Sequence, residues 1–151
     1  MLFKALRNPG IFSAWNEKEI EEAIQTPKYI SPALDNEKQL ILEKLHQHMQ
    51  SSRPFLGPEL TLDELAAQLS VKPKMLSQTI NELLNQNFFE FINHYRIEEA
   101  KRLLTNPKDK KITVLEVMYE VGFNSKSSFN TIFKKNTGLT PSEFKKNHHL
   151  Q

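Results

Sequence analysis

Apolar residues recur at helical spacing in two stretches of this chain, residues 59 to 88 and 111 to 141, and the second stretch repeats the first. Residues three and four positions apart share one face of a helix, so the spacing predicts helices with one buried side. The buried positions of the first helix in each copy stand 52 residues apart and are Leu62, Leu65 and Leu69 in one copy and Val114, Val117 and Val121 in the other. The pattern predicts a duplicated helical unit.

Helix caps repeat with the same offset. Thr61 and Glu64 form a Thr-x-x-Glu capping box ahead of the first apolar run, and Thr113 and Glu116 form one ahead of the second. The caps and the apolar spacing together predict short helices at about 62–69 and 114–120.

Each copy continues into a second helix after a turn of a few residues. Leu76 and Ile80 are repeated 53 residues later as Phe129 and Phe133, so the second copy has one extra residue in its turn. We expect these helices at about 73–84 and 126–137. A short helix, a turn and a second helix are typical of a helix-turn-helix.

The turns carry residues that suit unusual backbone conformations. Gly122 supplies the positive φ that such a corner often requires, and Ser70 at the equivalent place does so less readily. Asn85 and Gly138 follow the second helices, where a left-handed residue commonly ends a helix. Two further capping boxes follow, at Asn87 to Glu90 and at Thr140 to Glu143.

A longer helix is predicted between the copies, over residues 88–105, and Asn106-Pro107 ends it. Its apolar residues at helical spacing are Phe88, Phe91, Ile92, Tyr95, Leu103 and Leu104. About 18 residues of helix span roughly 27 Å, comparable to the roughly 34 Å of one duplex turn that separates paired recognition helices. One rigid connector could present both copies to one face of DNA.

The predicted fold class is all-α, with two helix-turn-helix units of the homeodomain-like kind, a long linker helix and an amino-terminal helical extension. A single helix-turn-helix pattern could equally be two packed helices of any all-α protein, and the tandem duplication favours the DNA-binding reading. We assign residues 1–34 to an amino-terminal segment, 35–58 to an amphipathic helix with a Pro-rich connector, and 59–151 to the main domain. Within that domain the predicted parts are 59–86, 88–105 and 111–147.

These residues resemble the AraC/XylS-type transcription regulators. The run from Val121 to Phe129, followed by Phe133-Lys134-Lys135 and by Gly138-Leu139-Thr140-Pro141, is similar to the second motif of that family. The run from Tyr95 to Leu104 is similar to its linker helix. The resemblance covers about residues 59 to 148 and implies two helix-turn-helix units that enter successive major grooves of DNA.

Three positions depart from the family pattern. Met118 stands where the family usually has Ala at the crossing of the two helices, whereas Ala66 keeps the small residue in the first copy. Ser70 and Asn85 stand where the family often has Gly. None of these positions is expected to face DNA.

Polar positions opposite the buried residues are the candidates for reading bases, and they match the base-contacting positions of the family. In the first copy they are Lys74, Ser77, Gln78 and Asn81. In the second copy they are Lys126, Ser127, Ser128, Asn130 and Thr131. Gln and Asn pair bidentately with adenine, whereas Lys prefers guanine acceptors. The alternative for each residue is a solvated polar face.

Three further basic residues have other expected roles. Lys134 and Lys135 lie toward the end of their helix and are candidates for DNA phosphate, with ordinary solubilising charge as the alternative. Arg96 lies in mid-linker among apolar neighbours, and we expect it to pair with a buried carboxylate and to be structural.

Charge is distributed unevenly along a chain whose net charge is only +2. Residues 59 to 100 carry three Lys or Arg against seven Asp or Glu, and residues 101 to 151 carry ten against four. We therefore expect the second copy and the chain end to dominate attraction to phosphate, and the first copy to contribute more to discrimination.

Other functional classes find little support. There are no cysteines, which excludes disulfides and thiolate metal sites and fits a cytoplasmic setting. His46 and His48 stand two apart, so they point to different sides of a helix and cannot share a metal. Phosphate loops, Ser-centred elbows and zinc motifs are absent, so we expect no cofactor, no metal and no enzymatic activity. The competing class is a helical protein-protein interaction module that leaves DNA alone.

The amino-terminal 58 residues have a less regular pattern. Residues 17–24 could form a short helix, residues 26–32 are rich in helix breakers, and residues 36–50 predict an amphipathic helix with Leu40, Ile41, Leu45 and Met49 on one face. We expect that face to pack on the following domain, with a homodimer through it left open.

This region also resembles the segment that precedes the DNA-binding domain in AraC-type regulators with a transmembrane sensor. The resemblance implies a cytoplasmic tail whose opening stretch, Leu2 to Phe12, is a juxtamembrane remnant, so a membrane partner is expected only through a missing sensor. The alternative is a free-standing extension. Double-stranded DNA is the main expected partner, with the transcription machinery as a further one.

Overall fold

The structure of the chain, a computed structural model, describes residues 32–106, 108 and 111–149. The expectations for Leu2 to Phe12, for a helix at residues 17–24 and for the connector as far as Ser31 lie outside these residues. The chain divides into two compact parts, Met1–Asp35 and Asn36–Gln151, and the described portion of the first is the opening turn of helix α2.

All regular structure in the described residues is helical, which confirms the predicted fold class. Helix α2 (Pro32–Ser51) is followed by a single 3₁₀ turn, η2 (Pro54–Leu56). The helix was expected only from residue 36, and it begins four residues earlier because Pro32 suits the first turn, where its missing N–H costs no hydrogen bond.

The first motif consists of α3 (Leu62–Leu69) and α4 (Pro73–Leu84), as the periodicity predicts. Thr61 caps α3 through its side chain, which accepts a hydrogen bond of 3.2 Å from the Glu64 backbone N–H. Ser70, between the helices, adopts the left-handed conformation at φ 56°, and Asn85 ends α4 at φ 52°. Both polar residues therefore take the turn conformation for which the second copy has glycine.

The second motif consists of α6 (Val114–Glu120) and α7 (Lys126–Thr137), again at the predicted residues. Its turns use Gly122 at φ 92° and Gly138 at φ 79°. A final helix, α8 (Pro141–His149), begins at the capping box of Thr140 and Glu143. The duplication visible in the sequence is thus a duplication of structure.

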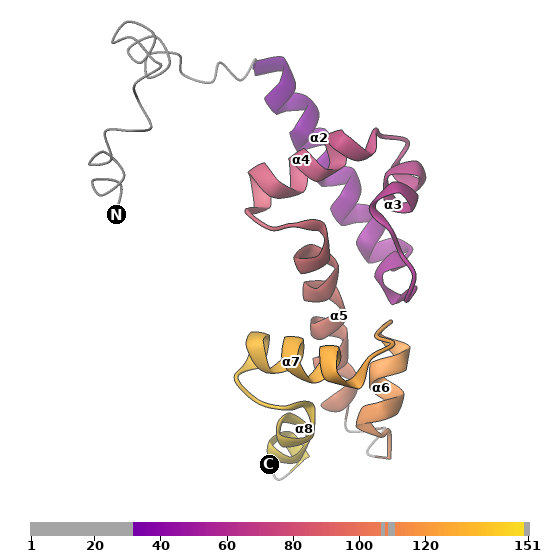
Figure 1. The fold of residues 1–151 in the computed structure, drawn as a ribbon, viewed down its shortest axis with the longest axis vertical. Coiled ribbons are helices and arrows are strands. Elements are labelled where there is room, and N and C mark those ends of the chain that lie inside the picture. The colour runs from indigo at the N-terminus through magenta and orange to yellow at the C-terminus, as the bar shows by residue number, and fades with distance from the viewer. Residues whose placement is uncertain (1–31, 107, 109–110, 150–151) are drawn as a thin grey trace, which may run out of the picture. The chain divides into compact units, whose positions relative to one another are not determined.

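Helix α5 (Phe88–Leu104) connects the two motifs, and Figure 1 shows α4 and α7 lying across its opposite ends. Its residues enter two separate hydrophobic cores. Phe91 and Ile92 belong to the core of the first motif, whereas Ile97, Ala100 and Leu104 belong to the core of the second. Helix α5 therefore contributes buried residues to both cores.

Helix α2 is part of the first core. Ile41, Leu45 and Met49 are buried there, so the apolar face packs on the motif that follows. Leu40 is 59% exposed and does not belong to this face, because it precedes Ile41 by one residue and so lies about 100° around the helix.

Candidate nucleic-acid interface

Helix α4 has one buried and one polar side. Leu76, Thr79 and Ile80 are fully buried, and the Thr79 hydroxyl donates a 2.8 Å hydrogen bond to the Met75 carbonyl. Of the predicted base-contacting residues, Lys74 and Asn81 are exposed, while Ser77 and Gln78 are half-buried. These four polar side chains stay out of the core, so α4 presents donors and acceptors of mixed kind to solvent.

Helix α7 repeats this division. Phe129 and Phe133 are fully buried and stack edge to face with ring centroids 5.6 Å apart. Lys126, Ser127, Ser128 and Thr131 are exposed, and Asn130 is half-buried. The Ser125 hydroxyl accepts a 3.3 Å hydrogen bond from the Ser128 backbone N–H and thus fixes the start of the helix.

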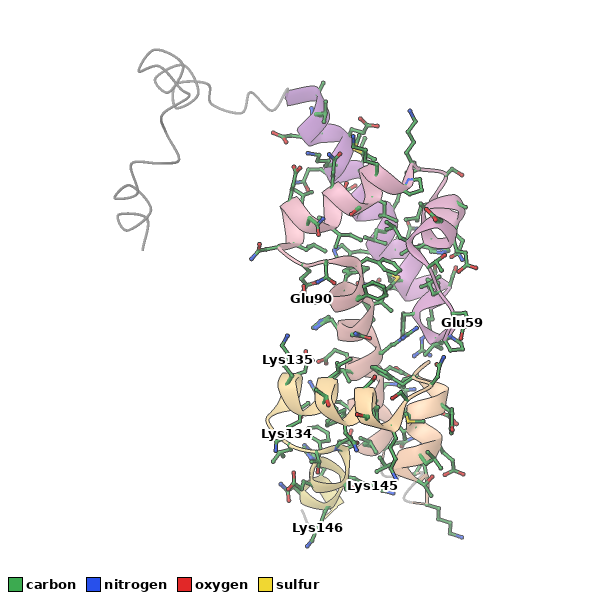
Figure 2. All side chains as sticks on the ribbon, viewed as in Figure 1. Glu59, Glu90, Lys134, Lys135, Lys145 and Lys146 are labelled. Atoms are coloured by element: carbon green, nitrogen blue, oxygen red, sulfur yellow. The ribbon has the colours of Figure 1, made fainter. Side chains whose placement is uncertain are left out.

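Basic side chains gather on the second motif and on α8. Lys134 and Lys135 are exposed on the last turn of α7, and Lys146 is exposed on α8 (Figure 2). Lys145 differs, because its ammonium group donates a hydrogen bond to the Ile112 carbonyl and so ties α8 to the start of the motif.

The Glu143 carboxylate lies close to Lys134. The pKa of Glu143 is lowered, first by the backbone N–H of Thr140, then by the Thr140 hydroxyl and to a smaller extent by the charge of Lys134. The carboxylate is engaged in capping α8, with a hydrogen bond of 2.8 Å from Thr140 N–H. Lys134 therefore has an acidic neighbour and remains exposed.

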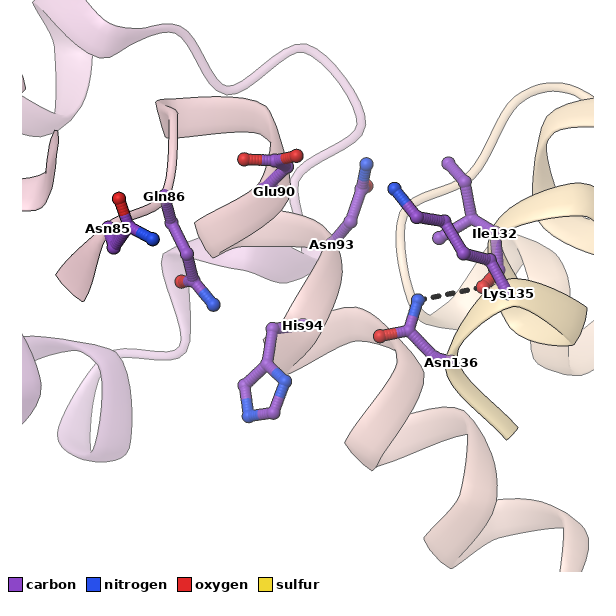
Figure 3. A pocket seen from close by; sticks show the side chains of 8 residues that line it. All are labelled: Asn85, Gln86, Glu90, Asn93, His94, Ile132, Lys135 and Asn136. Carbon is purple, nitrogen blue, oxygen red and sulfur yellow. Dashed lines mark hydrogen bonds between the residues drawn. The ribbon is translucent and has the colours of Figure 1, made fainter. Parts of the chain in front are cut away.

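A polar hollow of about 270 Å³ lies between the end of α4, α5 and α7 (Figure 3). Its lining residues are Asn85, Gln86, Glu90, Asn93, His94, Ile132, Lys135 and Asn136. Lys135 extends from α7 toward Asn93 of α5, and Asn136 donates a 2.7 Å hydrogen bond to the Ile132 carbonyl. Seven of these eight residues have polar side chains, unlike the residues of the apolar pockets that enclose small-molecule ligands.

Arg96 is part of the fold, but its expected partner was wrong. Its guanidinium donates to two backbone carbonyls, of Phe55 at 2.7 Å and of Gly57 at 2.8 Å. No ion pair of Arg96 occurs among the described residues. The carbonyls of a 3₁₀ turn and the residue that follows it accept these hydrogen bonds instead of a carboxylate, and burial lowers the pKa of the guanidinium.

Sequence reasoning also missed the 3₁₀ turn and a buried charge. The segment around Pro54 and Gly57 was expected only to mark a boundary, yet Phe55 is buried in the first core. Lys38 of α2 is 3% exposed and forms an ion pair of 2.5 Å with Glu82 of α4. An aromatic residue between two prolines was the available signal for Phe55, whereas no local pattern marks Lys38.

The histidines have ordinary partners. His46 shares a 2.9 Å hydrogen bond with the Tyr95 hydroxyl, and His48 shares one of 2.7 Å with the Gln68 amide oxygen. Within the described part of the chain, no cluster of three or more His, Asp or Glu is arranged to hold a metal ion. The helices of that part also include none that is long and apolar enough to cross a membrane.

Comparison with known proteins supplies the class. A family described as a helix-turn-helix domain matches residues 65–147. The chain is 35% identical over 92 residues to the uncharacterized HTH-type transcriptional regulator YijO of Escherichia coli K12. The aligned stretch covers 61% of this chain and 31% of that protein. The chain belongs to this helix-turn-helix domain family, and the resemblance to AraC-type regulators is confirmed.

Solved structures share the fold. The carboxy-terminal domain of AraT, a response regulator from Geobacillus stearothermophilus, is 28% identical with a TM-score of 0.54, over 79% of this chain and 88% of that one. The DNA-binding domain of AdpA, solved with a target DNA, has a TM-score of 0.60 at 17% identity, over 73% of this chain and 93% of that one. The chain spans at most half the length of the curated relatives it matches.

Proposed function

We propose that the chain is the DNA-binding part of a transcription regulator and that it inserts α4 and α7 into successive segments of the major groove. The observation that carries the proposal is the polar outward side that each of these helices keeps opposite a fully buried one. The major groove admits an α-helix, and its base edges offer partners for the Lys, Ser, Gln, Asn and Thr side chains present.

The arrangement around α5 supports the use of both motifs together. Helices α4 and α7 lie across opposite ends of one helix of 17 residues, which spans roughly 26 Å. Paired recognition helices that bind one face of a duplex are separated by about one turn, roughly 34 Å. The likeness to the AdpA domain, whose structure contains a target DNA, agrees with this proposal.

The two motifs would divide the work of binding. Lys74, Ser77, Gln78 and Asn81 of α4 and Lys126, Ser127, Ser128, Asn130 and Thr131 of α7 would read base edges. Lys134 and Lys135 would contact phosphate, and Lys146 adds to the positive charge of that region. The hollow beside Lys135 contains amide groups and the Glu90 carboxylate, so Lys135 and the amides are the groups there that could donate to a DNA phosphate.

Two features of the whole protein belong to the same proposal. A duplex-DNA partner implies that the domain works in the cytoplasm, alone or as the tail of a membrane-anchored sensor. Contact with the transcription machinery would follow DNA binding, and any self-association would use a surface other than the apolar face of α2, which is buried in the first core. Neither role involves catalysis.

Selection from random duplexes with the purified chain tests the proposal. We expect an enriched sequence with two half-elements, one read by α4 and one by α7, about one helical turn of DNA apart. We also expect affinity to fall steeply as salt concentration rises. Negligible affinity for every duplex at low salt would refute DNA binding and would favour a helical module that docks on proteins. Enrichment of a single half-element would refute joint insertion of α4 and α7.

A further inference from the structure

The turn of the second motif touches the 3₁₀ turn that precedes the first. Gly122 approaches η2 so closely that a Cβ built on it would lie 2.8 Å from the Leu56 carbonyl oxygen and 2.9 Å from that of Phe55. The Cβ atoms of real side chains essentially never lie this close to another heavy atom. Gly122 is therefore required for two reasons, its φ of 92° and its close backbone contact with Leu56 and Phe55, which precede it by 66 and 67 residues.

Arg96 of α5 lies at the same junction. Its Nε donates to the Phe55 carbonyl and its Nη2 to the Gly57 carbonyl, at 2.7 and 2.8 Å. Its guanidinium carbon lies 5.5 Å from the ring centroid of Phe123, the residue after Gly122. One planar side chain thus binds η2 through hydrogen bonds and the second motif through a cation–π contact.

A third contact closes the junction at its exposed side. The Asn124 amide donates a 3.0 Å hydrogen bond to the Glu59 carboxylate, which stands just before α3. Figure 2 shows Glu59 at the end of the first motif nearest to the second. We call Arg96, Gly122, Asn124 and Glu59, together with the carbonyls of η2 and Gly57, the clasp.

Helix α5 is shared by both motifs. The two hydrophobic cores of the described residues have no buried residue in common, so core packing joins each motif to its own part of α5 and joins the motifs to each other through that helix. The clasp acts at a second place, off the α5 axis. Two points of attachment resist bending and rotation of one motif relative to the other more strongly than a single helix does.

We propose that the clasp fixes the distance and the rotational phase between α4 and α7, and so determines which spacing of half-elements the protein accepts. This proposal rests on the proposed function. A duplex turns once in about 10.5 base pairs, so adding one base pair between half-elements rotates one of them by roughly 34°. If the two recognition helices are held rigidly, they cannot both reach their half-elements after that rotation, and affinity falls. If the helices can move relative to each other, both half-elements stay within reach and affinity changes little.

Gly122→Ala tests the clasp, and Gly138→Ala is its matched control. Both residues have positive φ, so both substitutions strain the backbone, but a Cβ at Gly138 has nothing within 4 Å. Arg96→Lys is the second variant, because it keeps the positive charge and loses the fork that reaches two carbonyls. Should Gly122→Ala fail to fold, Arg96→Lys carries the test, with Arg102→Lys on the same helix as control.

The first readout is binding to the selected duplex and to versions with one base pair added or removed between half-elements. We expect wild type and controls to lose about tenfold or more in affinity on the altered spacings, and the clasp variants to lose about threefold or less. A merely structural role would weaken binding to all duplexes by one factor and leave this ratio unchanged. An unchanged ratio would overturn the proposal.

The second readout needs no DNA. The chain contains no cysteine, so spin labels can be attached at Ala67→Cys on α3 and Glu120→Cys on α6, both exposed, without removing native thiols. We expect a broader or shifted distance distribution in the clasp variants than in wild type and Gly138→Ala. Identical distributions would overturn the clasp even if DNA binding is established. If wild type binds no duplex, the proposed function fails and the clasp is judged by this measurement.

Discussion

Single residues take the conformations that their place in the repeat requires. Ser70 and Asn85 are left-handed at φ 56° and 52°, where the second motif has Gly122 and Gly138. The backbone geometry of the turn therefore persists although the residue differs. The same equivalence assigns outward positions, because residues opposite Leu76 and Ile80 correspond to those opposite Phe129 and Phe133.

Gln78 is one of the two amide residues of α4 that are predicted to read bases. An amide pairs bidentately with the N6 and N7 groups of adenine, so Gln78→Ala should remove preference at one position of the selected duplex, by about 1 to 3 kcal/mol. Affinities for duplexes that carry each of the four base pairs at that position measure it. Equal weakening on all four would contradict the assigned role, and Gln39→Ala on the exposed side of α2 should leave all four unchanged.

Glu99 makes stability depend on pH. Its pKa is lowered, first by the hydrogen bond from Arg102 and also by Arg53, whose Nη2 lies 2.6 Å from the carboxylate. A lowered folded pKa means that the contribution to stability is complete above the ordinary value of 4.5 and is lost as pH falls through the folded value. Between about pH 5 and pH 3 the free energy of unfolding should therefore fall more steeply in wild type than in Glu99→Gln.

Urea unfolding at several pH values measures this difference. Arg102→Met removes the strongest partner of the Glu99 carboxylate, so the free energy of unfolding of this variant should also fall less steeply with pH than that of wild type. Parallel curves for wild type and Glu99→Gln would contradict the assignment.

At the scale of elements, local signals in the sequence predicted α3, α4, α6 and α7 to the residue. Each begins at a capping residue or a proline and ends at a left-handed position or a turn, so short-range chemistry defines its bounds. Helix α2 and the turn η2 were less predictable. Their burial depends on α4 and α5, which contribute to the same core from far along the chain.

The ion pair between α2 and α4 should be asymmetric in its effect on stability. The Lys38 side chain is 4% exposed and that of Glu82 is 35% exposed. Glu82→Gln leaves a buried ammonium group without its counter-charge and should cost about 2 kcal/mol, below the usual 3 to 5 kcal/mol because Glu82 is partly solvated. Lys38→Met keeps the apolar stem and removes the buried charge, while the Glu82 carboxylate is already partly solvated, so it should cost less than about 1 kcal/mol.

Urea unfolding of the two variants, extrapolated to water, gives both values. Equal costs, or a larger cost for Lys38→Met, would show that the buried ammonium is not the sensitive partner.

At the scale of the whole molecule, positive charge is concentrated on the second motif and α8, where Lys134, Lys135, Lys145 and Lys146 lie (Figure 2). A lysine that neutralises a phosphate adds about 0.9 to the slope of log affinity against log salt concentration. Lys134→Ala should therefore reduce the magnitude of that slope by about 0.9 and weaken binding to every duplex alike.

Lys74→Ala is the matched comparison in the first motif. Lys74 is predicted to read a base, so its loss should alter sequence preference and leave the salt slope nearly unchanged. Titrations at four salt concentrations on selected and unrelated duplexes separate the two outcomes. If Lys134→Ala and Lys74→Ala change the slope equally, the division of work between the motifs is wrong.

The sequence by itself determined the duplicated helices, their caps and turns, and which side of α4 and α7 is buried. These features follow from chemistry within a few residues, such as the Thr61 and Thr113 capping boxes and the spacing of Phe129 and Phe133. The family resemblance rests on the same local residues.

Only the tertiary structure decided how the two motifs are held together. The acceptors of Arg96 are backbone carbonyls, which every residue has, so no side-chain pattern could mark Phe55 and Gly57 as its partners. Gly122 likewise looked like a turn residue, and its approach to η2 arises because segments distant in sequence meet at one point. The separation of the two recognition helices is therefore set largely by contacts to backbone carbonyl oxygens, which are the same in every residue and so leave no mark in the sequence.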